Sequence, residues 1–228
     1  MSEFLKGSDR LMQSIAELKV NLFSPEAITK FWKAKLQADG KRIGLDISVL
    51  DCNWTKREMR KPMIGINGAE VPSMMVYIPQ ELYGQEGLIK LGQMYPKMNI
   101  WPVQKETVAW VMRDSPDSSK KGRWIKVEAT IDAPNINTTE KDLKNHAKAK
   151  KYSRQRLITY IFASQASKDL TGHYLDEEST WSRLGTHFQS EVAYVRFHSD
   201  GDLTIPWPLD PQAHGAGIGG RFEEVKKA

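Results

Sequence analysis

Asp46, Asp51 and Glu128 are the carboxylates whose positions could support metal-dependent cleavage of a phosphodiester. Nucleases of this kind cluster carboxylates around a divalent ion, often with a lysine near the attacked phosphate. Asp46 and Asp51 fall in strand-like sequence, and Lys126 stands two residues before Glu128. The usual spacing is an acid, one residue and then a lysine, but Thr130 occupies that last position here. Because alternate residues of a strand share a face, we interpret Lys126 and Glu128 as an exposed pair, and a metal-dependent nuclease stays the main enzymatic alternative.

Other patterns of catalytic or metal-binding residues do not occur in the sequence. The five histidines have no ligand spacing, no serine lies in a nucleophile elbow, and Cys52 is the single cysteine. We therefore expect no catalytic residue, no bound metal and no cofactor. A single cysteine also excludes an internal disulfide and fits a reducing compartment.

The composition is typical of a globular chain. Of the 228 residues, 40% are hydrophobic and 27% are charged, with a net charge of +5. No stretch approaches the length of uncharged apolar sequence that spans a membrane, and the N-terminus lacks the basic and apolar regions of a secretory signal. We expect a soluble cytoplasmic protein with no membrane partner.

Basic residues are concentrated between Glu140 and Lys168, where eight lysines and arginines stand against two acids. On a helical wheel of about 100° per residue, Lys141, Lys148 and Lys151 lie within about 60° of Lys144, and Arg154 lies about 80° from it. The segment "LITYIF" (157–162) then covers most of the wheel with apolar residues, led by Leu157 and Ile161. The pattern predicts one helix with a cationic first half and a buried second half.

A cationic helix face can contact phosphates, because lysines at helical spacing follow a nucleic-acid backbone and release counterions. The basic turn at 120–123 and the aromatic residues Trp110, Trp124 and Tyr152 favour a groove for single strands. A core position is nonetheless the favoured interpretation for each aromatic residue by itself. A solvated lysine-rich surface is the simpler alternative. The candidate nucleic-acid-binding residues are Lys120, Lys121, Arg123, Lys141, Lys144, Lys148, Lys151 and Arg154.

The order of segments in residues 87–168 resembles the phage single-strand annealing proteins of the essential-recombination-function type. In that family a β-hairpin precedes a helix with a Tyr-Ala-Arg-Arg-Tyr-Ala-Leu-like sequence and an apolar end. Here "VAWVMRDSPDSSKKGRWIKVEATI" is similar to the hairpin and "KKYSRQRLITYIFAS" to the helix, while "GLIKLGQMYPKMNIWPVQ" takes the place of the preceding helix and strand. This chain departs from the family at Gln155 and lacks its acidic cluster after the helix. The resemblance implies an oligomeric ring or filament that binds single-stranded DNA in a basic groove and pairs complementary strands, without catalysis or a cofactor.

The elements that would position these residues predict an α+β fold in three parts. A helical hairpin fills residues 1–40, and in its second helix Ser24 is the expected N-cap and Pro25 the first residue. A core domain follows at 41–210. The Gly-rich residues 211–228 are expected to be a mobile tail.

Within the core domain we expect an antiparallel sheet built from hairpins, with a long basic helix at about 138–168 packed on it. Alternating apolar residues and turn signals place its other elements. They are strands at 42–54 and 71–79, a short helix within 81–98, a hairpin of 106–113 with 123–133, and a hairpin in 191–208 that turns at 199–201.

Three functional hypotheses remain open. The first is a self-assembling nucleic-acid-binding protein without enzymatic activity, for which single-stranded DNA is favoured and RNA is possible. The second is the metal-dependent nuclease. The third is a structural protein of a phage or virus, or a subunit of a CRISPR-type ribonucleoprotein, since "HGAGIGGRF" (214–222) is similar to the glycine-rich loops of such subunits.

Overall fold

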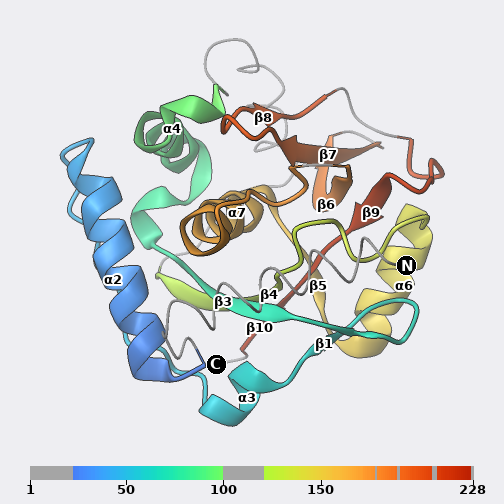
Figure 1. Cartoon of the computed structure of the whole chain (residues 1–228), viewed down its shortest axis with the longest axis horizontal. Coiled ribbons are helices and arrows are strands. Elements are labelled where there is room, and N and C mark those ends of the chain that lie inside the picture. The colour runs from blue at the N-terminus through green and yellow to red at the C-terminus, as the bar shows by residue number, and fades with distance from the viewer. Residues whose placement is uncertain (1–22, 100–120, 178, 189–190, 207–209, 227–228) are drawn as a thin grey trace.

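The computed structural model describes residues 23–99, 121–177, 179–188, 191–206 and 210–226 (Figure 1). Helices and strands are interspersed over these ranges, which confirms the α+β class. The strands form two four-stranded sheets and one two-stranded ladder. Within the described ranges, no helix combines the length and the apolar character needed to cross a bilayer.

The first four-stranded sheet is antiparallel, with the order β3-β4-β10-β5. Its strands are β3 (Ser73–Ile78), β4 (Arg123–Glu128), β10 (Phe222–Val225) and β5 (Ser153–Arg154). β4 pairs with β3 on one edge and with β10 on the other. Residues 106–113 were expected to pair with 123–133 in a hairpin, but both edges of β4 are already paired with other strands. Residues 106–113 lie outside the described residues.

The second four-stranded sheet has the order β8-β7-β6-β9. Its strands are β6 (Trp181–Phe188), β7 (Glu191–Phe197), β8 (Leu203–Thr204) and β9 (Ile218–Gly220). β7 and β8 confirm the hairpin expected in 191–208, and Gly201 in its turn has a φ of 98°, which favours glycine. The β6–β9 pair is parallel, so the expectation of antiparallel sheets alone was wrong there.

The N-terminal helix α2 (Pro25–Lys41) begins as the sequence predicts. Ser24 accepts a hydrogen bond from the amide of Ala27 at 3.1 Å, and Pro25 occupies the first turn. The other helix of the expected hairpin, near 8–22, lies outside the described residues. Residues 42–54 contain no strand, contrary to expectation, and lead into the short helix α3 (Lys56–Arg60). The expected helix within 81–98 is α4 (Gly84–Met94).

The expected single helix at 138–168 is two helices, α6 (Glu140–Lys150) and α7 (Leu157–Thr171). Lys151 ends α6 in the left-handed conformation, with a φ of 61°. Ser153 and Arg154 then form β5 and pair with β10. The periodic pattern on the wheel was therefore interrupted by pairing with a strand about 70 residues later in the chain, which local periodicity cannot reveal.

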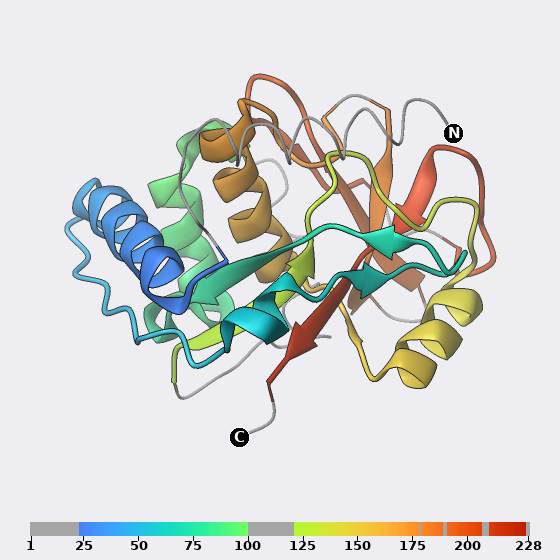
Figure 2. The same ribbon diagram turned by 60° about the horizontal axis from the view of Figure 1, so that its bottom comes forward.

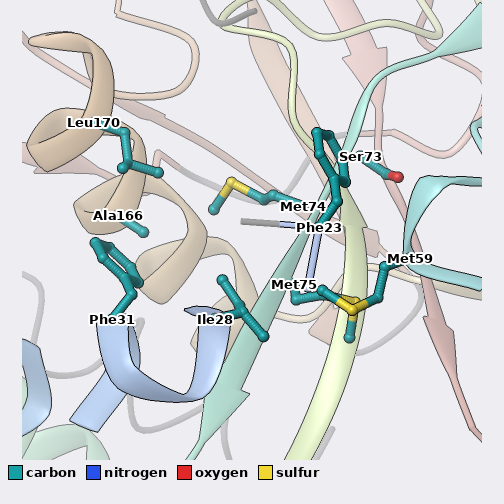
Figure 3. Close-up of a pocket in the computed structure, with 9 residues that line it drawn as sticks. All are labelled: Phe23, Ile28, Phe31, Met59, Ser73, Met74, Met75, Ala166 and Leu170. Atoms are coloured by element: carbon teal, nitrogen blue, oxygen red, sulfur yellow. The ribbon is translucent and has the colours of Figure 1, made fainter. Parts of the chain in front are cut away.

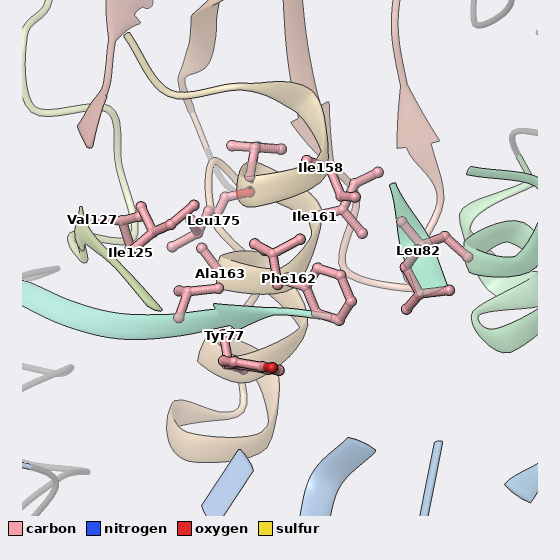
Figure 4. Close-up of a cluster of buried hydrophobic side chains, with 14 of the residues drawn as sticks. Tyr77, Leu82, Ile125, Val127, Ile158, Ile161, Phe162, Ala163 and Leu175 are labelled. Carbon is pink, nitrogen blue, oxygen red and sulfur yellow. Dashed lines mark hydrogen bonds between the residues drawn. The ribbon is translucent and has the colours of Figure 1, made fainter. Parts of the chain in front are cut away.

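The apolar half of the basic segment is core, as expected. Leu157 is 2% exposed and Ile161 is fully buried. Phe162 and Ala163 of α7 face the side chains of β3 and β4 (Figure 4), while Tyr160 stacks on Phe197 of β7 with ring centroids 5.9 Å apart. α7 therefore lies between the two four-stranded sheets.

The C-terminal residues are part of both sheets, so the expectation of a mobile tail at 211–228 was wrong for the strands β9 and β10. Their glycines serve close packing. A Cβ on Gly219 would lie 2.8 Å from the Cβ of Ala133, and one on Gly220 would lie 2.6 Å from a methyl of Leu143. The glycine-rich composition reflects tight contacts here, and it is no sign of flexibility.

Candidate nucleic-acid interface

α6 is amphipathic in the structure. Leu143 and Ala147 are buried in a small apolar cluster with Met63 and Phe222. The opposite side of the helix and its C-terminus present cations to solvent. These exposed side chains are Lys141, Lys144, Lys148, Lys150 and Lys151.

An N-terminal cap and two hydrogen bonds to Ile64 hold α6 in place. A capping box joins Thr139 and Asp142 at its N-terminus. His146 lies 2.7 Å from the carbonyl oxygen of Ile64, and the amide of Ile64 donates to the hydroxyl of Tyr152 at 3.2 Å. α6 is therefore held against β1 (Met63–Ile64), which pairs with β2 (Glu70–Val71), and its lysine face points away from this contact.

The carboxylates of α6 lie at its N-terminal end. Glu140 is buried and accepts from Arg154 at 2.7 Å. Asp142 caps the helix, and its hydrogen bonds with Thr139 lower its pKa. In the part of the chain that the structure describes, no carboxylate lies at ion-pair distance from Lys148, Lys150 or Lys151. Their face therefore remains electropositive.

The structure separates the other predicted site residues from this face. Lys121 is exposed, and the guanidinium of Arg123 lies 5.5 Å from the ring centre of Tyr83. Arg123 is the first residue of β4 and Lys121 precedes it by two residues, and β4 begins on the opposite side of the molecule from α6 (Figure 1). Lys120 lies outside the described residues. The basic turn and the lysine face therefore do not form one surface.

Arg154 is a structural residue, contrary to its predicted role in binding. Its side chain is 8% exposed, and it donates to Glu140 and to the carbonyl oxygens of Arg183 and Leu184. It joins the start of α6 to β6. The wheel placed Arg154 near the lysines only because it assumed that the helix continued through β5.

Two of the three aromatic residues considered for a stacking platform are described, and both pack within the fold. Trp124 is 4% exposed and donates to the carbonyl oxygen of Leu50 at 3.1 Å. Tyr152 is half-buried against Phe222, with ring centroids 6.0 Å apart. Trp110 lies outside the described residues. The preference for single strands loses the support of Trp124, which is enclosed in the core.

The proposed exposed pair of Lys126 and Glu128 is wrong, because both side chains are buried on β4. Lys126 donates to the carbonyl oxygen of Glu58 at 3.0 Å. Glu128 accepts from the amide of Phe222 at 2.9 Å and from the side chain of Asn135 at 3.1 Å. Burial raises the pKa of Glu128 to about 7, although these hydrogen bonds act in the opposite direction.

The carboxylates considered for a nuclease do not meet. Asp46 and Asp51 are exposed, whereas Glu128 is enclosed in the sheet. Over the described ranges, no three histidine, cysteine, aspartate or glutamate side chains form a group that could hold a metal ion. An apolar crevice between α2, β3 and α7 measures about 10 Å³, room for about one water molecule, and is lined by Met59, Met74 and other apolar side chains (Figure 3).

A second cationic cluster went unnoticed in the sequence. Four of the six residues in "KREMRK" are basic, and all four are exposed on α3 or at its end: Lys56, Arg57, Arg60 and Lys61. The compact run was the signal, although its position relative to α6 could not be read from the sequence.

No family model, no curated protein and no solved structure matches this chain.

Proposed function

We propose that this protein binds nucleic acid, with single strands as the first candidate, through the exposed lysines of α6. The observation that supports this most is the combination of a rigidly docked helix with an outward cationic face. The apolar side of α6 is buried with Met63 and Phe222, while its carboxylates are confined to the N-terminal end. Lys148, Lys150 and Lys151 are consequently available for phosphate oxygens.

The spacing of the lysines suits a phosphate backbone. From Lys141 to Lys148 the helix advances by about 10 Å, at about 1.5 Å per residue. Successive cations along this line can each neutralise a phosphate and release its counterion, so affinity falls as salt rises. The contacts are independent of base identity, which fits a protein that binds strands of any sequence.

We further propose that several copies of the protein bind along one strand, because one short helix contacts few phosphates. Such an assembly could pair complementary strands in phage or plasmid recombination, the activity implied by the resemblance to annealing proteins. No catalytic step is needed. The proposal places the protein in the cytoplasm, where a nucleic-acid strand would be available.

The test is to replace Lys144, Lys148 and Lys151 together by glutamine. Affinity for single- and double-stranded oligonucleotides should be measured over a range of salt concentrations. We expect the slope of log K against log salt to fall by about 2, near 0.7 per lost contact on a single strand. The matched control replaces three lysines exposed elsewhere, Lys30, Lys41 and Lys97.

Wild-type affinity and slope in the α6 variant would remove α6 from the binding site. Light scattering on the same samples should show species larger than one chain when a long strand is present. Assembly that ignores nucleic acid would favour the structural-protein hypothesis. Cleavage of the strand with magnesium, abolished by Asp51→Ala or Glu128→Ala, would favour the nuclease.

A further inference from the structure

The exposed basic residues of α3 form a surface distinct from the face of α6. Lys56, Arg57, Arg60 and Lys61 line one shallow hollow of about 620 Å³. Within the described ranges, none of these four side chains has a carboxylate at ion-pair distance. Four unpaired cations on about one and a half turns of helix make this one of the most concentrated positive charges described in the chain.

α3 is held firmly although it is short. Thr55 and Glu58 form a capping box at its N-terminus, and Met59 is 2% exposed in the core. Glu58 is also ion-paired with Lys226 at 2.9 Å. The single carboxylate of the helix is therefore paired with Thr55 and Lys226. It does not neutralise the exposed cations of α3.

The end of α3 is tied to α6 through β1. Ile64 follows Lys61 by three residues, a distance of at most about 10 Å along an extended chain. Ile64 is the residue that contacts His146 of α6 and the hydroxyl of Tyr152, which is next to Lys151. The two basic surfaces therefore border the same short ladder, β1–β2, from its two ends (Figure 2).

We infer that α3 is the second half of a two-part phosphate-binding surface, and that one nucleic-acid strand passes from α6 across β1–β2 to α3. This inference rests on the proposed function and extends it to a longer site. Two cationic clusters separated by one short ladder suit a long polyanion. A membrane surface would also need apolar side chains, and the large exposed ones in the described ranges, Leu50 and Ile136, belong to neither helix.

Glu70 marks the path of this strand. It is exposed on β2 and paired in register with Ile64, which places it on the ladder that joins the two helices. A phosphate chain that crosses the ladder must pass near it. Glu70→Gln should therefore raise the affinity for a long strand, and leave the affinity for a strand too short to reach the ladder unchanged.

The experiment replaces Lys56, Arg57, Arg60 and Lys61 by glutamine and measures binding to thymidine oligonucleotides of about 3 and about 30 nucleotides, lengths that bracket common single-strand site sizes. On the long strand, the slope of log K against log salt should fall by about 3. On the short strand, which occupies one cluster at a time, the loss should be smaller. The control replaces four other exposed lysines, Lys30, Lys33, Lys41 and Lys97.

The outcomes separate this inference from the function on which it rests. If the α6 variant loses affinity and the α3 variant matches its control on the long strand, the two-part surface is refuted and the proposed function stands. If neither variant differs from its control, both are refuted. If the α3 variant does not fold, Lys56→Gln with Lys61→Gln, at the two ends of the helix, should still lower the slope by about 1.4. An unchanged slope in that double variant overturns the inference.

Discussion

The exposed lysines of α6 and the buried arginines beside the sheets carry the same charge in opposite surroundings. Lys148 and Lys150 extend into solvent from a helix whose other side is apolar. Arg183 and Arg221 are fully buried and donate to backbone carbonyl oxygens. The difference shows that a count of basic residues along this chain overstates its binding surface, since part of the positive charge holds the fold together.

The choice between lysine and arginine follows from their chemistry. The guanidinium has five donors in a planar fork, so one buried arginine can bond several carbonyl oxygens and a carboxylate at once. Arg221 does this with Thr130, Ile131 and Asp176. The ammonium of lysine is more strongly hydrated and stays at the surface on a flexible stem. Lys126 is an exception, since it is buried and donates to the carbonyl oxygen of Glu58.

The largest expected effect on stability comes from replacing a buried arginine. Arg221→Ala should lower the free energy of unfolding by about 3–5 kcal/mol, because it leaves Asp176 buried without its cation. The two groups are 3.1 Å apart, and neither is exposed to solvent. Urea denaturation measures the change. The matched control is Arg42→Ala, which removes a largely exposed arginine 3.4 Å from Asp39 and should cost about 1 kcal/mol or less. Equal losses in the two variants would contradict the contrast.

A second expected effect concerns pH, because Glu128 is a buried acid whose pKa is influenced by Arg221 and Arg154. Its pKa is about 7 in the folded chain and 4.5 in the reference state. The folded chain therefore binds this proton more tightly, so the contribution to stability is fully present below about pH 4.5 and is lost as the pH rises through about 7. A shift of this size corresponds to a free energy on the order of 3 kcal/mol.

Glu128→Gln tests this, since glutamine cannot ionise and its side-chain oxygen can still accept from the amide of Phe222. Between about pH 5 and about pH 8, the free energy of unfolding should fall in the wild type relative to this variant. The exposed Glu70→Gln serves as the control and should follow the wild type. Parallel pH profiles for the wild type and Glu128→Gln would mean that Glu128 does not titrate as proposed.

Local signals in the sequence predicted several elements correctly. Ser24 and Pro25 located the start of α2, and the apolar run from Leu157 identified the buried helix. The break between α6 and α7 was not predictable in this way, because it depends on a left-handed Lys151 and on pairing with β10 far along the chain. Long-range pairing with β6 likewise made a strand of β9, whose glycines indicated a mobile tail.

The residues of the candidate site were predicted only in part, again because long-range contacts decide where they lie. The lysines of α6 are exposed as expected, since polar residues opposite Leu143 and Ala147 have only solvent to face. Arg154 was assigned to the binding surface because one continuous helix was assumed, whereas it lies in β5 and donates to Glu140. The start of β4 also lies far from α6. The relation between α3 and α6 depends on contacts with Ile64, which separate segments of sequence do not reveal.

The smallest expected effect on stability belongs to the lysines with the largest expected effect on binding. Replacing Lys144, Lys148 and Lys151 by glutamine should change the free energy of unfolding by about 1 kcal/mol or less. Lys144 loses one exposed ion pair with Glu140, at 3.6 Å, and Lys148 loses a weak interaction with the helix dipole. Glutamine keeps good helix propensity, and it is no more strained than lysine at the left-handed position 151. Urea denaturation beside the Arg221→Ala protein measures the difference. A loss near that of Arg221→Ala would place these lysines among the structural cations, and weaker binding by the variant would then reflect unfolding.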